Sequence, residues 1–175
     1  MTGSSALRNV LALLAFSLSW PICAMERVYQ SPESFIAEVF KANPPSKLVW
    51  LTKDAQAVVS DILGHAPRQL RQRYWGDGTR TLWVLEEIGK EELITAGFVV
   101  HQGRIEQAKI LAYRESRGME VRYPAFLKQF KGAVLNSDNH LDRTIDGISG
   151  ATLSVIAMQR MARTALYLDQ LSSIK

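Results

Sequence analysis

The sequence predicts an α+β domain in which a small antiparallel sheet of three to four strands packs with flanking helices, the last of them a long C-terminal helix. Two patterns indicate this fold. Short apolar runs separated by tight turns lie in the middle of the chain, and apolar residues at helical spacing lie on both sides of them. Close spacing favours antiparallel pairing, because parallel strands need long crossovers. With 175 residues, 47% of them hydrophobic, the chain can bury one core.

The strands are expected between residues 70 and 113. Residues 73–75 and 81–85 flank a Gly-Asp-Gly-Thr segment that is typical of a hairpin loop. Residues 94–100 and 105–113 are two further β-like runs, joined by a short polar turn. A sheet of this size needs cover on at least one face, which the flanking helices can supply.

The helices show start and stop signals. Ser31 precedes a proline and is typical of an N-cap, and the next helix is expected to begin at Thr52 or Asp54 and to end at Gly64. A short apolar run, residues 48–51, is a candidate strand between these helices. Two more helices are expected at residues 124–130 and 153–171.

Residues 1–24 resemble a secretory signal peptide or an uncleaved anchor. Arg8 precedes an apolar run, residues 10–19, that is short for a bilayer span, and Ala24 offers a small residue for cleavage. A buried N-terminal helix is the alternative. The sole cysteine, Cys23, lies in this segment, so a cleaved chain would have no thiol for a disulfide, a haem or a zinc site.

Composition and motif order argue against several classes of protein. The net charge is +4 and basic residues alternate with acidic ones, so we expect no nucleic-acid partner. The three histidines are widely spaced, and we expect no metal site. Residues 147–151 approximate a serine nucleophile elbow, but all three histidines precede Ser149 and no parallel βαβ pattern leads into it. We therefore predict no catalytic residues.

Residues 146–154 combine a glycine-containing turn, clustered hydroxyl side chains and the start of a helix. The first helical turn leaves backbone N–H groups unpaired at the positive end of the helix dipole, which favours an anion such as phosphate. Gly147 and Gly150 permit close backbone approach. In the alternative interpretation, Ser149 merely caps the helix and the glycines merely make a turn. The residues alone leave both open.

This segment resembles the flavinylation motif of the FMN-binding domain family, whose best-known members are periplasmic subunits of sodium-pumping NADH:quinone reductases and Rnf-type complexes. The resemblance implies that Thr152 carries FMN through a phosphoester bond, installed by a periplasmic flavin transferase with FAD as donor. The matching positions are Asp146, Ser149, Gly150, Ala151, Thr152 and Ser154.

The resemblance extends more loosely over roughly the last hundred residues. Glu115 and Ser116 occupy a Glu-Ser/Thr-x-Gly loop that lies near the flavin in the family, which adds them to the expected cofactor-binding residues. Arg117 and the Met119-Glu120 pair replace a more usual Pro-Gly-Leu-Gly continuation, so the contacts to the flavin ring stay open.

The implied organisation is a signal peptide or anchor over residues 1–24, an N-terminal helical region over 25–69 and an FMN-binding domain over 70–175. The implied protein is a periplasmic electron-transfer relay, free or membrane-associated, that docks to a membrane or periplasmic redox partner. It would be an electron carrier or a subunit of a redox complex rather than a stand-alone enzyme. The alternatives are an FMN-carrying component of a periplasmic reductase and a non-redox periplasmic binding or assembly protein.

Overall fold

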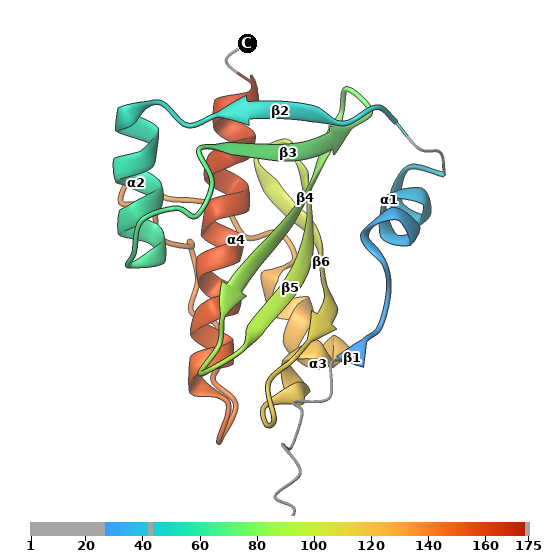
Figure 1. The fold of residues 1–175 in the computed structure, drawn as a ribbon, viewed down its shortest axis with the longest axis vertical. Helices are drawn as coiled ribbons and strands as arrows, with labels where there is room; N and C mark the ends of the chain where they lie inside the picture. The colour runs from blue at the N-terminus through green and yellow to red at the C-terminus, as the bar shows by residue number, and fades with distance from the viewer. Residues whose placement is uncertain (1–26, 42–43, 174–175) are drawn as a thin grey trace, which may run out of the picture.

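The computed structural model describes residues 27–41 and 44–173, so the expected signal segment, residues 1–24, lies outside the described residues. Six antiparallel strands form one sheet in the order β1-β6-β5-β4-β3-β2 (Figure 1). The elements in chain order are β1 (Arg27–Val28), α1 (Pro32–Phe40), β2 (Lys47–Trp50), α2 (Lys53–Leu63), β3 (Arg71–Gly76), β4 (Arg80–Ile88), β5 (Leu93–His101), β6 (Arg104–Tyr113), the 3-10 turn Met119–Arg122, α3 (Pro124–Leu127), the 3-10 turn Lys128–Phe130 and α4 (Thr152–Ser173).

The α+β class, the antiparallel sheet and the long C-terminal helix are confirmed, but the expected number of three to four strands is wrong. The two further strands lie at opposite edges of the sheet: β1, which was not expected, and β2, which overlaps the candidate strand at residues 48–51. They have two and four residues, too few for an alternating pattern to be read. Each is held by its neighbour, β1 by β6 and β2 by β3, so pairing rather than local sequence determines them. The segment 25–69 thus supplies strands as well as helices.

The helix boundaries follow the expected capping signals. The side-chain oxygen of Ser31 accepts a hydrogen bond from the Ser34 N–H at 3.1 Å, and that of Thr52 accepts one from the Ala55 N–H at 3.3 Å. Gly64 ends α2 with a φ of 76°, in the left-handed region that glycine adopts readily. The expected starts at Ser31 and Thr52 and the expected stop at Gly64 are confirmed.

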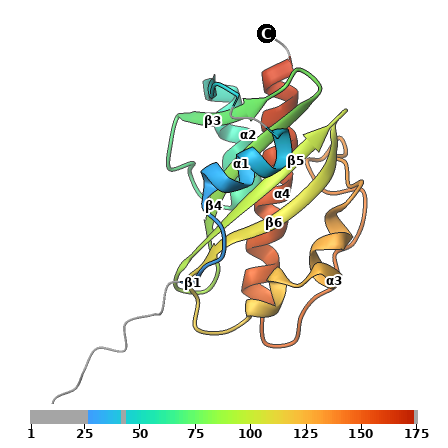
Figure 2. The same cartoon turned by 90° about the vertical axis from the view of Figure 1, so that its right-hand side faces the viewer.

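The sheet is covered on both faces. On one face, α1 packs Phe35 against Leu82 and Val99, as Figure 2 shows with α1 in front of the sheet and α4 behind it. Phe35 lies directly over Gly97 of β5, where an added Cβ would come within 2.4 Å of the ring. On the other face, α4 contributes most of its buried residues to the larger core, and α2 packs beside α4.

Polar contacts tie the C-terminal end of α4 to the sheet. The Thr81 hydroxyl donates to a carboxylate oxygen of Asp169 at 2.5 Å and accepts from the Trp83 indole N–H at 2.9 Å. Burial raises the pKa of Asp169. With this end anchored, the opposite end of α4 lies where the loops after β4 and β6 meet it (Figure 1). None of the helices in the described ranges has the length and apolar character needed to cross a membrane.

Candidate functional site

A cleft of about 570 Å³ lies where α4 begins. Three segments form its walls: the turn after β4, the loop after β6 and the first turn of α4. Six of the eight residues expected at the cofactor line it: Glu115, Ser116, Gly150, Ala151, Thr152 and Ser154. The lining also includes Lys90, Arg117 and Leu153. The other two expected residues, Asp146 and Ser149, are exposed on the preceding loop and are not part of this lining.

The turn before α4 presents Thr152 to solvent. The N–H of Ala151 donates to the Ile148 carbonyl at 2.9 Å, and the N–H of Val155 donates to the Ala151 carbonyl at 3.0 Å. Ala151, rather than Ser149, therefore occupies the N-cap position, and Thr152 is the first helical residue, with an exposed side chain. Gly150 has a φ of 78°, and no atom lies within 4 Å of where its Cβ would be. The glycine keeps both the turn and the approach to Thr152 open.

The second hydroxyl of the motif is buried. Ser154 is 4% exposed, and its oxygen lies 2.9 Å from the Tyr113 hydroxyl, which itself donates to the Arg117 carbonyl. Burial raises the pKa of Tyr113, and the hydrogen bond to Ser154 opposes this shift. Tyr113 keeps its own proton in the bond to Arg117, so Ser154 donates to Tyr113. This engagement leaves Thr152 as the exposed hydroxyl at the start of α4.

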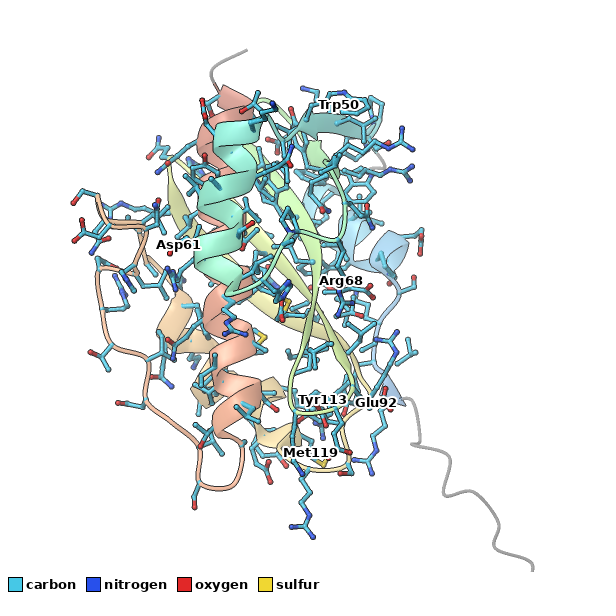
Figure 3. All side chains as sticks on the ribbon, turned by 60° about the vertical axis from the view of Figure 1, so that its left-hand side comes forward. Trp50, Asp61, Arg68, Glu92, Tyr113 and Met119 are labelled. Carbon is cyan, nitrogen blue, oxygen red and sulfur yellow. The ribbon has the colours of Figure 1, made fainter. Side chains whose placement is uncertain are left out.

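Gly118 allows these groups to come together. It has a φ of 86°, and an added Cβ would lie 2.8 Å from the Tyr113 hydroxyl and 2.9 Å from the Ala151 Cβ. The loop after β6 can therefore lie against the start of α4 only because this position has no side chain. Figure 3 shows Tyr113 and Met119 at the end of the molecule where α4 begins.

Glu115 holds the neighbouring turn. One of its carboxylate oxygens accepts backbone N–H groups from three consecutive residues: Lys90, Glu91 at 2.8 Å and Glu92 at 3.0 Å. The adjacent Gly89 has no room for a Cβ, which would lie 2.7 Å from the same oxygen. The carboxylate thus positions the turn that brings Lys90 to the cleft. Figure 3 shows Glu92 of this turn at the same end of the molecule as Tyr113.

The cleft suits a phosphate ester. Lys90 and Arg117 supply positive charge, and the first turn of α4 adds unpaired N–H groups at the positive end of its dipole. One oxygen of the Glu115 carboxylate is already hydrogen-bonded by three backbone N–H donors. Leu153 and Ile156, 47% and 37% exposed, provide apolar surface beside Thr152. Sequence reasoning missed Lys90, because the sequence does not reveal that its turn folds back onto Glu115.

Residues 89–167 match the family model of the FMN-binding domain. This part of the chain belongs to the FMN-binding domain family. The matched segment begins at the turn held by Glu115 and contains all the residues that line the cleft. Membership of the FMN-binding domain family implies FMN as the cofactor, as the sequence predicted. No curated protein matches the chain.

Proposed function

We propose that this FMN-binding protein is exported, carries its FMN covalently on Thr152 and acts as an electron-transfer relay. One observation carries the proposal. Within the FMN-binding domain, the exposed hydroxyl of Thr152 stands at the first position of α4, in a cleft that also contains Lys90 and Arg117. The neighbouring hydroxyl of Ser154 is engaged by Tyr113.

The attachment is a phosphoryl transfer. The Thr152 oxygen bonds to the phosphorus on the FMN side of FAD, the pyrophosphate bond breaks, AMP leaves, and the hydroxyl proton passes to a base of the transferase or to water. The product is a phosphodiester with one negative charge. The first-turn N–H groups of α4 and the cations Lys90 and Arg117 stabilise that charge. The bound flavin supplies one- and two-electron redox chemistry.

Export and covalent attachment support each other. The N-terminal segment has the pattern of a signal peptide, and outside the cytoplasm a noncovalent cofactor would be lost by dilution. A covalent bond removes the association cost that each noncovalent binding event carries. A relay is favoured over a stand-alone enzyme because the acidic group of the cleft, Glu115, is committed to three backbone N–H groups.

The test is co-expression with a periplasmic flavin transferase, followed by flavin fluorescence on a denaturing gel. We expect a fluorescent wild-type band and no fluorescence for Thr152→Ala. Thr144→Ala is the matched control, because Thr144 carries an exposed hydroxyl just before the 146–154 segment and does not line the cleft. It should remain fluorescent.

Two results would count against the proposal. A wild-type band without fluorescence, from cells in which a known substrate of the transferase is labelled, would contradict covalent attachment. Fluorescence retained by Thr152→Ala would move the bond to another residue. Ser154→Ala then reports whether the engaged hydroxyl had become available. The relay itself is tested by reducing the attached flavin and following its reoxidation by a second redox protein.

A further inference from the structure

A second cavity, of about 260 Å³, lies between α2, α4 and the sheet, beneath the segment that connects α2 to β3. Figure 3 shows Arg68 on this connecting segment, away from Tyr113 and Met119 at the start of α4. Thr164, which lines the cavity, is twelve positions after Thr152, or about 18 Å along the helix. The apolar lining residues are Pro32, Leu51, Val59, Leu63, Pro67, Val84, Leu85, Met161 and Leu168.

The pairing of a partly exposed histidine with a buried carboxylate forms one polar part of this lining. Glu87 is 3% exposed, and both of its carboxylate oxygens lie 3.1 Å from Nε2 of His65. The other ring nitrogen of His65, Nδ1, faces the Ala66 carbonyl at 2.9 Å. Both ring nitrogens therefore face acceptors, which an imidazolium satisfies by donating from each. The pair is neutral as a whole, and each Glu87 oxygen retains a lone pair for a further donor.

An unpaired hydroxyl is a second polar feature of the lining, which also includes Arg68, Gln69, Gln72, Glu86 and Thr95. Thr164 is 6% exposed, and its oxygen has no hydrogen-bond partner within the described part of the chain. A buried hydroxyl without a partner costs free energy, because it has given up water without a replacement. Thr95, which also lines the cavity, is satisfied by Glu86 and Arg114. Thr164 is thus the side chain that a ligand could newly satisfy.

We propose that this cavity is a binding site for a small uncharged ring compound that carries a hydroxyl group. The ring would lie against the leucines, the ligand O–H would donate to Glu87, and Thr164 would donate to the ligand oxygen. The volume suits one or two fused rings and is below that of a typical drug-sized site. Two cations, His65 and Arg68, balance the carboxylates Glu86 and Glu87 in the lining, so the site offers no net charge to an ion.

The probes are 2-naphthol and naphthalene, titrated by calorimetry into the purified protein with its flavin attached. Naphthalene is the more hydrophobic, so a purely apolar cavity would favour it. We expect the reverse preference. In Thr164→Val, which keeps the shape and removes the hydroxyl, the affinity for 2-naphthol should fall about 3- to 10-fold while that for naphthalene is unchanged. The charged 2-naphthoate should bind more weakly than 2-naphthol.

Thr164→Val is a suitable variant because it removes an unsatisfied buried group, so its thermal stability should be equal to or higher than that of the wild type. A second variant, Glu87→Gln, should also weaken 2-naphthol selectively. Naphthalene binding more tightly than 2-naphthol, no binding of either probe, or equal 2-naphthol affinity in the wild type and a folded Thr164→Val protein would each overturn the proposal. The cavity shares no lining residue with the cleft at Thr152. A negative result with both probes therefore leaves the proposal of FMN attachment at Thr152 standing.

Discussion

The cleft and the cavity lie along one helix but have opposite characters. At the start of α4, Thr152 is exposed beside cations and unpaired N–H groups. One-half to three-quarters of the way along the helix, Met161, Thr164 and Leu168 face a cavity of mixed polar and apolar lining, in which His65 and Arg68 accompany the carboxylates Glu86 and Glu87. The difference follows from helix geometry. Only the first turn leaves N–H groups free to hold an anion, whereas the interior of the helix has satisfied its own backbone and offers side chains alone.

The largest effect that separates the two regions is expected for Gly118→Ala. The new Cβ would be strained by the positive φ and would press on the Tyr113 hydroxyl and the Ala151 Cβ. We expect the free energy of unfolding, measured with urea, to fall by about 3 kcal/mol, and flavin attachment at the adjacent Thr152 to slow. The affinity of the distant cavity for 2-naphthol should not change in the folded protein.

Gly78→Ala is the matched control for this prediction. Gly78 has a similar positive φ, 94°, but nothing lies within 4 Å of where its Cβ would be. The free energy of unfolding of Gly78→Ala should fall by about 1 kcal/mol, which is the cost of the strained backbone alone. If Gly78→Ala and Gly118→Ala lost the same free energy of unfolding, the contact between the loop after β6 and α4 would contribute nothing to stability.

A smaller loss is expected for Glu115→Ala. The substitution removes the oxygen that accepts three N–H groups of the turn after β4, although water can replace part of this bonding. We expect the free energy of unfolding to fall by about 2 kcal/mol and hydrogen exchange to rise at Lys90, Glu91 and Glu92. Glu115→Gln keeps one acceptor oxygen and should lose about half as much. Unchanged exchange in Glu115→Ala would refute the positioning role of the carboxylate.

The smallest effect concerns the cavity and depends on pH. The bond to the Ala66 carbonyl and the pairing with Glu87 raise the pKa of His65, while partial burial and Arg68 oppose the shift. A raised pKa means that the folded state binds the proton more tightly than the unfolded chain. This stabilisation is complete below the ordinary histidine pKa of about 6.5 and is lost as the pH rises through the raised value.

The measurement is the free energy of unfolding across that pH window for the wild type and for His65→Gln. The free energy of unfolding of the wild type should fall as the pH rises through this window. The variant should lack the part of this fall that His65 causes. A parallel pH dependence in both proteins would show that other groups cause it. Because the His65 side chain is 39% exposed, we expect the component to be small.

Much of the cleft was predictable because most of its residues fall in two short segments, 115–117 and 150–154. Residues 146–154 carry both the family motif and the physical signals of a helix start, and the loop with Glu115 and Ser116 was found by the same resemblance. The engagement of Ser154 was not predictable, because Tyr113 is 41 positions away and only the pairing of β6 with α4 brings them together.

The cavity and the β1 edge of the sheet could not be predicted for a related reason. The residues around the cavity are spread from position 32 to position 168, and no local pattern marks them as one site. The pairing of His65 with Glu87 depends on where the segment after α2 crosses β4. Likewise β1 has only two residues and exists through its pairing with β6, whereas the apolar run of β2 marked it only as a candidate strand. Sequence patterns show local structure well and distant contacts poorly.

The most direct test of the central claim is the mass of the intact protein after co-expression with a flavin transferase, followed by fragmentation of the modified peptide. We predict one added FMN less one water, located on Thr152, and an unmodified mass for Thr152→Ala. Flavin bound only noncovalently, or a modified peptide in which the phosphoester lies on another residue, would contradict the assignment of Thr152 as the attachment site.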